Sequence, residues 1–341
     1  MRDTIDRDNL FLLGGVFYNR SLDFPIPLAG VNYFNRDLFG KEIQANLFYG
    51  GVLTFGNLSD PDLFGSGLEG SADIFLQGFS GADRPLRNGR EVDREGVDRV
   101  GQNLELGLGL PFADHWKVKW TGALRFEGYA RDKETRRDFV IPTDTLVTVL
   151  GMEAEFNRQA WRVGASIHAS ERSNWEPWGL PGNPDFRVDA EDFVHYDAGV
   201  SKDFFLPLNQ KIHAEVTASG GGDLDRFSKY RFDYFGNRLR GFGGAGVRYT
   251  NGAKAQIQYA FNLGNIIRFE ATVDHARVKD REDPEVGDTG FRGFTGIGLS
   301  GQTIVGPNLI LTLDWGIVAA SEVKEFRGDQ EIFLTILRLF N

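Results

Sequence analysis

The chain has 341 residues, no cysteine and a formal net charge of −10. Its length would allow two or three soluble domains, but no Pro- or Ser-rich linker divides it and its composition does not shift midway. No apolar run approaches the roughly 18 residues of a membrane-spanning helix. The acidic balance argues against nucleic acid as a partner, and the absence of cysteine is compatible with an oxidising compartment.

The first predicted strand runs from about Asn9 to Asn19. Its residues Leu10-Phe11-Leu12-Leu13 are apolar on both faces, and Gly14 and Gly15 follow in mid-strand. Glycine weakens the interior of a strand, and a strand without a preferred face has a weakly specified register. This strand therefore differs from the ones that follow it.

Further along the chain, apolar and polar residues alternate with a period of two, which is typical of β-strands. In the segment from Trp116 to Ala130, Trp116, Val118 and Trp120 point to one side, and polar residues point to the other. The pattern recurs at 103–110, 161–168, 212–217, 254–262, 267–274 and 309–315. So many two-faced segments exceed what one soluble core can bury.

The connections between these segments alternate between short turns and long polar stretches. The long ones are Ser80 to Val100, Ala130 to Asp144, Glu171 to Asp192, Gly220 to Ala253 and Val278 to Gly290. Their charge, proline and glycine content predict solvated loops. The last predicted strand is Glu331 to Phe340, where Ile332-Phe333-Leu334 is again apolar on both faces.

A soluble barrel and a membrane barrel give the same alternation, but alternating short and long connections are typical of outer-membrane barrels. We therefore predict an all-β fold: a transmembrane antiparallel β-barrel of about 16 strands, formed by residues 1–341 as one domain. Trp116, Trp161 and Trp315 are expected on its lipid-facing surface. Trp175 and Trp178, in a long loop, are expected to pack within that loop.

The stretch from Arg231 to Gly246 is too rich in glycine and charge to be a strand, yet it carries the aromatic residues Phe232, Tyr234, Phe235 and Phe242. A long loop that keeps its aromatics usually folds back onto its own protein. Within it, Leu239-Arg240-Gly241-Phe242 resembles the Arg-Gly-Phe motif of the BamA/TamA superfamily of outer-membrane assembly barrels. In that family, the motif lies on the sixth extracellular loop, which tucks into the barrel.

Other segments resemble the same superfamily in order along the chain. The turns Asn35–Gly40 and Ser59–Phe64 match those after strands two and four, although Leu63 stands where an aromatic is usual. Asp274 matches the acidic residue of an aromatic-x-Asp-x-Gly strand, and the chain ends near an aromatic, Phe340. A second Arg-Gly-Phe, at 292–294, falls at the start of the predicted strand fourteen and is discounted.

The start of the chain departs from the resemblance. Residues Met1 to Asp6 lack the apolar core of a signal peptide, which an outer-membrane protein needs. The periplasmic POTRA repeats that usually precede the barrel are also absent. We therefore expect a mature or truncated form of a longer protein.

The resemblance implies a protein of the bacterial outer membrane that inserts or exports other proteins. Its partners would be the lipid bilayer, client β-barrel or secreted proteins, and periplasmic domains or accessory subunits. No cofactor, metal or catalytic residue is implied. The first and last strands would form a seam that opens, with the seam residues Leu10, Leu12, Gly14, Gly15, Ile332, Leu334, Ile336 and Phe340.

An ion pair is predicted to hold the loop inside the barrel. Arg240 would meet Asp274, or secondarily Glu270, because these two acids share the polar face of one strand. A guanidinium suits this role because it stays charged and can meet a carboxylate bidentately. The alternative is a solvated loop charge of little energetic value.

Two other functions remain open, a passive pore and, less favoured, a barrel enzyme. His195 and Asp197 lie two residues apart on one strand face and could form a catalytic dyad. The glycines at 241, 243 and 246 satisfy G-x-G-x-x-G, but no βαβ unit surrounds them, which favours a flexible hinge. The five histidines lack metal-binding spacing.

Overall fold

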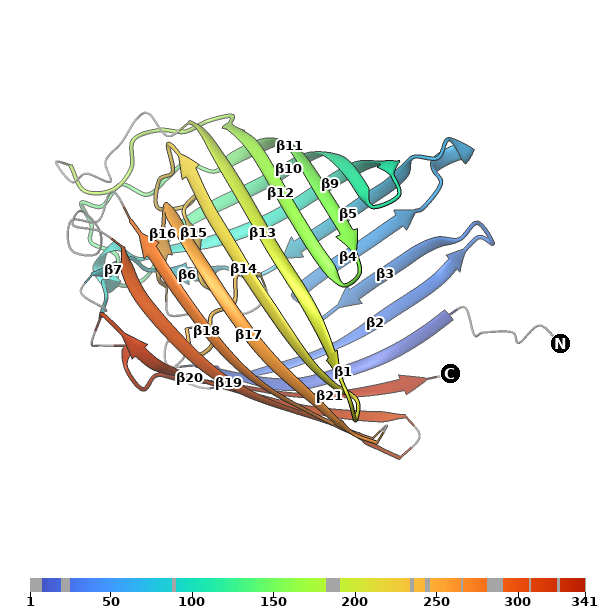
Figure 1. Cartoon of the computed structure of the whole chain (residues 1–341). Coiled ribbons are helices and arrows are strands. Elements are labelled where there is room, and N and C mark those ends of the chain that lie inside the picture. Colours follow the sequence, from blue (N-terminus) through green and yellow to red (C-terminus); the bar gives the residue numbers. More distant parts are fainter. Residues whose placement is uncertain are drawn as a thin grey trace.

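The computed structural model describes residues 8–19, 25–87, 90–181, 191–233, 236–242, 246–264, 266–280, 291–306, 308–323 and 326–340. Within them, 16 antiparallel strands form a closed barrel (Figure 1). No helix among the described residues is long and apolar enough to cross a membrane. The predicted all-β barrel and its strand number are confirmed.

The strands of the first half of the wall are β1 (Asp8–Asn19), β2 (Ile26–Leu38), β3 (Ile43–Tyr49), β4 (Leu53–Asp60), β5 (Glu69–Gln77) with its continuation β6 (Gly81–Asp83), β9 (Val97–Ala113), β10 (Trp116–Arg131) and β11 (Thr145–Arg158). Those of the second half are β12 (Trp161–Arg172), β13 (Asp192–Leu206), β14 (Gln210–Gly222), β17 (Asn251–Leu263), β18 (Ile267–Lys279), β19 (Arg292–Val305), β20 (Leu309–Ser321) and β21 (Gln330–Phe340). Short elements in the connections are η1 (Leu63–Gly65), β7 (Leu86–Arg87), β8 (Arg90–Glu91), η2 (Asp93–Glu95), β15 (Tyr230–Arg231) and β16 (Arg248–Tyr249).

The barrel closes where its first and last strands meet. β1 pairs antiparallel with β21, from Leu10 opposite Phe340 to Asn19 opposite Glu331. In Figure 1, the dark blue strand β1 lies beside the red strand β21. The expected meeting of the two strands is thus present, as a continuous ladder.

The alternation places apolar side chains on the outer surface of the wall. Leu106, Leu150 and Ile257 each have more than half of their surface exposed. Such exposure would be costly in water, but it suits a surface that faces lipid. On the inner side, the ammonium of Lys117 meets the carboxylate of Glu69 at 2.9 Å. The polar face of the strands therefore points into the barrel.

The strands at the closure are apolar on both sides, as their sequences predict. Val16 and Leu334 lie opposite each other and are exposed on the outside. Their neighbours Phe17 and Phe333 face the other way, with ring centroids 6.0 Å apart in an edge-to-face arrangement. A Cβ at Gly15 would lie 2.6 Å from the carbonyl oxygen of Leu334, so this close approach of the two strands requires glycine.

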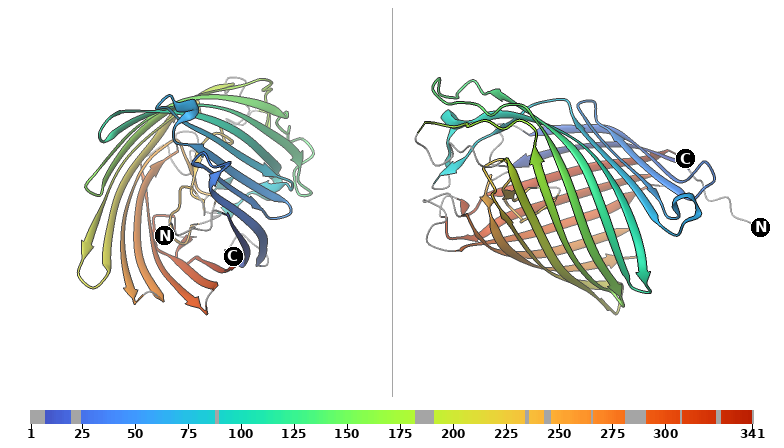
Figure 2. Two further views of the ribbon diagram at one scale, coloured as in Figure 1. Left: turned by 90° about the vertical axis from the view of Figure 1, so that its right-hand side faces the viewer. Right: turned by 90° about the horizontal axis from the view of Figure 1, so that it is seen from above.

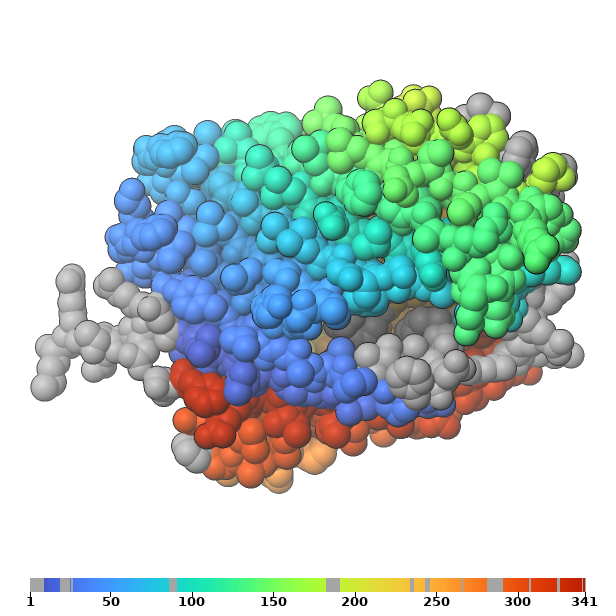
Figure 3. All heavy atoms as spheres, turned by 180° about the vertical axis from the view of Figure 1, so that it is seen from behind, coloured from blue at the N-terminus to red at the C-terminus, as the bar shows by residue number. Residues whose placement is uncertain are grey.

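Strands β3 and β4 are shorter than β2, and the turn that joins them at 50–52 is short. The wall therefore extends less far toward the long-loop rim at these strands. β2 pairs with β3 only from Val31 onward, and among the described strands β6 pairs only with β9. Figure 3 shows the wall hollowed there, between the blue strands of the N-terminal part and the cyan and green strands above them. The barrel therefore has an opening in its side, near the rim of the long loops.

Several predicted loop boundaries are wrong by a few residues, and the one before β9 illustrates the reason. β9 begins at Val97, inside the stretch from Ser80 to Val100 that its charges assign to a loop. Val97 pairs with Arg131 of β10 and with Asp83 of β6. Pairing on both sides therefore overrides the local polar composition.

Candidate functional site

The sixth connection on the long-loop rim, residues 223–250, enters the barrel, as Figure 2 shows in the view along its axis. We call it the lumen segment. It links β14 and β17, the eleventh and twelfth barrel strands, as predicted. Its strands β15 and β16 pair with each other. Tyr234, Phe235 and Gly243, singled out from the sequence, lie outside the described residues.

The motif at 239–242 rests directly on the barrel wall, on three glycines that we call the glycine seat: Gly296 and Gly298 of β19 and Gly316 of β20. A Cβ at Gly296 would overlap the carbonyl group of Arg240, and one at Gly298 would lie 2.7 Å from the Cδ of Arg240. A Cβ at Gly316 would lie 2.8 Å from the amide nitrogen of Gly241. The wall therefore has glycine at the three positions that the motif covers.

Gly241 also has to be glycine. Its φ is +82°, a left-handed conformation that is costly for other residues. A Cβ there would lie 2.5 Å from backbone atoms of β20. Both conditions explain why the motif has glycine at this place.

Phe242 is fully buried in an aromatic cluster inside the barrel. Its ring meets the edges of Phe294 at 5.4 Å and Phe326 at 5.9 Å, and Phe232 lies at 6.3 Å. Phe294 belongs to the second Arg-Gly-Phe, which was discounted from the sequence. It is not a second loop motif, but its phenylalanine packs against the first one.

The predicted ion pair of Arg240 is wrong. Asp274, which is fully buried, accepts a hydrogen bond from the backbone N–H of Arg240 at 3.0 Å and another from the amide of Gln256 at 2.7 Å. The Arg240 guanidinium forms no ion pair among the described residues. Glu270 instead accepts hydrogen bonds from Gln258 and Arg268. The glycine seat turns the Arg240 side chain along the wall, so only its backbone reaches Asp274.

Arg238 takes the role that was assigned to Arg240. Its guanidinium binds Asp314 of β20 at 2.6 Å and Glu331 of β21 at 3.0 Å. Glu331 is only 1% exposed. Because β21 is one of the two strands at the closure, this contact ties the lumen segment directly to the seam.

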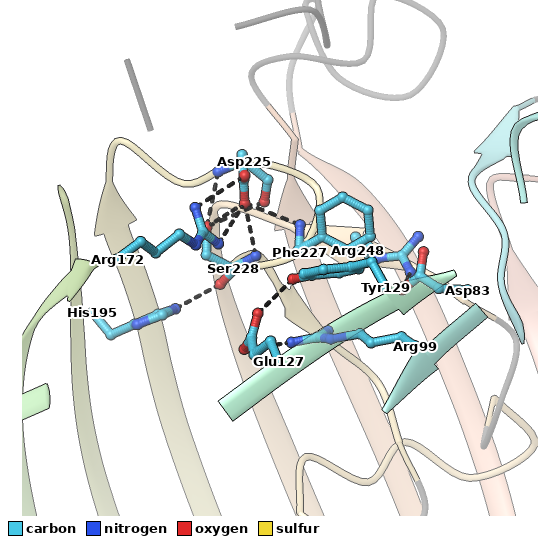
Figure 4. A network of polar contacts seen from close by, with 10 residues as sticks. All are labelled: Asp83, Arg99, Glu127, Tyr129, Arg172, His195, Asp225, Phe227, Ser228 and Arg248. Atoms are coloured by element: carbon cyan, nitrogen blue, oxygen red, sulfur yellow. Dashed lines mark hydrogen bonds and ion pairs between the residues drawn. The ribbon is translucent and has the colours of Figure 1, made fainter. Parts of the chain in front are cut away.

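A second group of contacts holds the beginning of the lumen segment (Figure 4). The carboxylate of Asp225 accepts two hydrogen bonds of 3.1 Å from Arg172 of β12. It also accepts bonds from the backbone N–H groups of Phe227 and Ser228. A buried carboxylate with this many donors is held in one orientation.

Next to it, Arg226 and Arg248 of the lumen segment share Asp83 of β6, at 2.7 and 2.6 Å. Arg226 also donates to the carbonyl oxygen of Glu95 at 2.8 Å. Buried arginines are tolerated only when their donors are satisfied. The lumen segment is thus fixed to the wall at β6 and β12 as well as at β20 and β21.

Aromatic residues of strand β10 and of the connection between β12 and β13 surround Phe227 of the lumen segment. The rings of Trp178 and Tyr129 lie 4.8 and 4.9 Å from it, and that of Trp175 lies at 6.2 Å. Trp175 and Trp178 are buried. They pack against each other, as expected within their loop, but also against Phe227 of another connection. Trp116 and Trp161 are exposed on the outer surface, as predicted.

His195 and Asp197 do not bond to each other. The Nε2 of His195 lies 2.7 Å from the carbonyl oxygen of Ser228. Asp197 accepts a hydrogen bond of 3.0 Å from the hydroxyl of Tyr230. Both residues position the lumen segment, and nothing in this geometry supports a catalytic dyad. The described residues hold no group of three or more side chains suited to a metal ion.

Two tyrosines of the lumen segment have altered acidity. Burial raises the pKa of Tyr249 to about 12, and burial beside Asp197 raises the pKa of Tyr230 above its usual range. Desolvation disfavours the phenolate in both cases. Both side chains therefore act as neutral hydroxyls at ordinary pH.

The eight predicted seam residues lie on the two closing strands. Leu10 is opposite Phe340, and Gly14 is opposite Ile336. The other four predicted residues lie opposite residues that were not predicted. Leu12 is opposite Arg338, Gly15 opposite Thr335, Ile332 opposite Tyr18, and Leu334 opposite Val16.

Sequence reasoning missed Arg238, Arg226, Asp225 and their wall partners. Their only signal is the density of charged residues between Asp223 and Arg248, which we assigned to solvent. Charges in a loop that also carries aromatics can instead be paired inside a polar lumen.

Comparisons with known proteins agree with the geometry at the level of the fold. No family model and no curated protein matches the sequence. Among solved structures, CdiB from Acinetobacter baumannii is 14% identical with a TM-score of 0.63, and its match covers 98% of this chain and 60% of that one. CdiB from Escherichia coli is 12% identical with a TM-score of 0.65, covering 98% and 63%.

BamA from Haemophilus ducreyi lacking POTRA domains 1–3 is 13% identical with a TM-score of 0.59, covering 98% of this chain and 70% of that one. The chain spans about 60 to 70% of the length of these three structures. It has the fold of the BamA and CdiB barrels, which confirms the fold expected from the resemblance to the BamA/TamA superfamily.

Proposed function

We propose that this barrel lies in the bacterial outer membrane and inserts or exports other proteins through the seam between β1 and β21. The fold shared with BamA and CdiB supports this function, as does the motif at 239–242 inside the barrel. The clients are β-barrel or secreted proteins. Periplasmic domains or accessory subunits assist, and no covalent chemistry is required.

The observation that carries the proposal is the contact of Arg238 with Glu331. Arg238 belongs to the lumen segment and Glu331 to the seam strand β21. Withdrawal of the lumen segment would take the Arg238 guanidinium away from a buried carboxylate on β21, and breaking a buried ion pair is strongly unfavourable. Movement of the lumen segment and opening of the seam between β1 and β21 are therefore energetically linked.

The seam also has the features of a ladder that exchanges partners. β1 and β21 are apolar on both faces, so their register is weakly specified, and Gly14 and Gly15 weaken β1. On the outside of β21, the apolar residues Ile332, Leu334 and Ile336 lie between the polar Gln330 and Arg338. An open edge at this place would template an incoming strand by backbone hydrogen bonds.

Disulfide locking tests the seam, because the chain has no cysteine of its own. Val16 and Leu334 are opposite across the seam, and Leu313 and Leu334 are opposite across the neighbouring ladder of β20 and β21. The variants Val16→Cys/Leu334→Cys and Leu313→Cys/Leu334→Cys share one cysteine and differ only in the ladder they lock. Pairs at suitable Cα distances form disulfides on oxidation.

We expect the seam disulfide to abolish insertion of an unfolded eight-stranded β-barrel into proteoliposomes, with recovery on reduction. The control disulfide should leave insertion unchanged. Equal activity of both oxidised variants would contradict the seam mechanism. A steady conductance in planar bilayers that is the same with and without either disulfide would favour a passive pore.

A further inference from the structure

A cavity of about 350 Å³ lies between the wall and the lumen segment. Strands β5, β6, β9 and β10 form one side, and Arg231 of β15 reaches it from the lumen segment. Its charged lining residues are Asp83, Arg99, Arg125, Glu127 and Arg231. The volume is in the range of small-molecule sites.

Both carboxylates of this cavity are already neutralised. Glu127 binds Arg99 at 2.7 Å and accepts a hydrogen bond from the hydroxyl of Tyr129 at 2.5 Å. Asp83 is shared by Arg226 and Arg248, which lie outside the lining. Each of the two acids is therefore already paired with at least one arginine other than Arg125 and Arg231.

Arg125 and Arg231 are the remaining charges, and neither forms an ion pair among the described residues. Arg125 is half-buried and lies opposite Asn103 in the ladder of β9 and β10. The buried Oδ1 of Asn103, also in the lining, has no hydrogen-bond partner. Arg231 is exposed in the interior of the barrel and lines the same cavity. The cavity thus has an excess of positive charge in a protein of net charge −10.

We propose that this cavity binds a phosphate-class anion, held between Arg125 of the wall and Arg231 of the lumen segment. The planar guanidinium forms paired hydrogen bonds with phosphate oxygens. Such an anion would offset the repulsion among the arginines and would tie the lumen segment to the wall at a third place. It is distinct from the contacts of Arg226 and Arg238.

The opening in the side of the barrel provides a route to this cavity. β6 borders the opening on one side and contributes Gly81 and Ala82 to the cavity lining. On the other side, Pro27 of β2 lacks a backbone donor, which discourages pairing of this edge with another strand. The anion can therefore be free phosphate or the phosphorylated headgroup of a lipid.

Inorganic phosphate is the first probe, measured by ³¹P line broadening and by thermal shift on the whole barrel in detergent. The variants are Arg125→Gln, Arg231→Gln and the double variant. Arg162→Gln is the matched control, because Arg162 lies on β12 outside the cavity and pairs with Asp203. Loss of one charged hydrogen-bond donor should weaken phosphate binding about tenfold.

We expect phosphate to raise the melting temperature and to slow proteolysis of the lumen segment in the wild type and in Arg162→Gln, but not in the double variant. Equal responses of wild type and double variant, or no response of either, would overturn the proposal. Intact circular dichroism of the double variant ensures that loss of binding is not loss of fold.

A competition experiment identifies the source of the anion. A phosphorylated diacyl lipid in nanodiscs should displace phosphate if the natural ligand enters from the membrane. A lipid of the same chains with a neutral headgroup is the control. Displacement by the phosphorylated lipid alone assigns a lipid ligand, whereas binding of phosphate that neither lipid affects assigns a soluble anion.

Discussion

At the scale of single residues, the glycine seat decides where the lumen segment lies. We expect Gly296→Ala to displace the motif, because its Cβ would overlap the carbonyl group of Arg240 and steric overlap of this kind costs about 1–3 kcal/mol. Faster proteolysis of the lumen segment would report the displacement. Gly301→Ala on the same strand is the control, since its nearest neighbour would be 3.9 Å away.

The two arginines of the motif region should differ in their energetic importance. Arg238→Ala removes the ion pairs with Asp314 and with the buried Glu331, and breaking a buried pair costs about 3–5 kcal/mol. Arg240→Ala removes no ion pair and keeps the backbone bond to Asp274, so its effect should be smaller. Heat stability of the two variants gives the comparison, and a larger loss in Arg240→Ala would contradict the assignment.

The buried tyrosines predict a loss of stability at alkaline pH. The pKa of Tyr249 is about 12 in the folded protein and about 10 in an unfolded chain. Its contribution to stability is therefore complete below pH 10 and disappears as the pH rises to 12. Proteolysis of the lumen segment should accelerate over this interval. Tyr249→Phe should reduce the slope, and an unchanged slope would assign the effect to other groups.

At the scale of elements, the ladders of the wall differ in length. The seam ladder extends from Leu10 to Asn19 on β1, whereas the pairing of β3 with β4 covers only Gln44 to Tyr49. The proposal that the seam separates most easily remains a prediction, and ladder length alone favours the β3–β4 hairpin. The seam must therefore depend on its glycines and its weak register rather than on a short ladder.

Amide hydrogen exchange separates these two possibilities. If register and glycine content dominate, amides of β1 and β21 should exchange faster than those of the neighbouring strand β20. If length dominates, the β3–β4 hairpin should exchange first and the seam should resemble the rest of the wall. Exchange of the seam at the same rate as β20 would count against lateral opening without a client.

At the scale of the whole molecule, the outward apolar surface predicts behaviour in solution. Leu106, Leu150 and Ile257 belong to a continuous outer band of exposed apolar side chains, which water does not tolerate over such an area. The protein should purify only in detergent, show mostly β circular dichroism and migrate faster on gels before boiling than after it. A soluble monomer without detergent would be incompatible with a membrane barrel.

Local patterns in the sequence specify the architecture. Period-two alternation, as in Trp116 to Ala130, depends only on neighbouring residues, so strand number, inner and outer faces and the two unusual closing strands follow from it. The place of the Leu239–Phe242 motif between strands eleven and twelve follows from the same count.

The partners inside the barrel were decided only by the tertiary structure. Arg238, Asp314 and Glu331 are far apart in the chain, and closure of the barrel brings them together. Alternation indicates that a charge faces the lumen, but the polar face of every strand offers partners of similar chemistry. The choice of Arg238 over Arg240 depends on how Arg240 lies on the wall, with its backbone against Gly296 and its side chain against Gly298. No local pattern of residues encodes this steric condition.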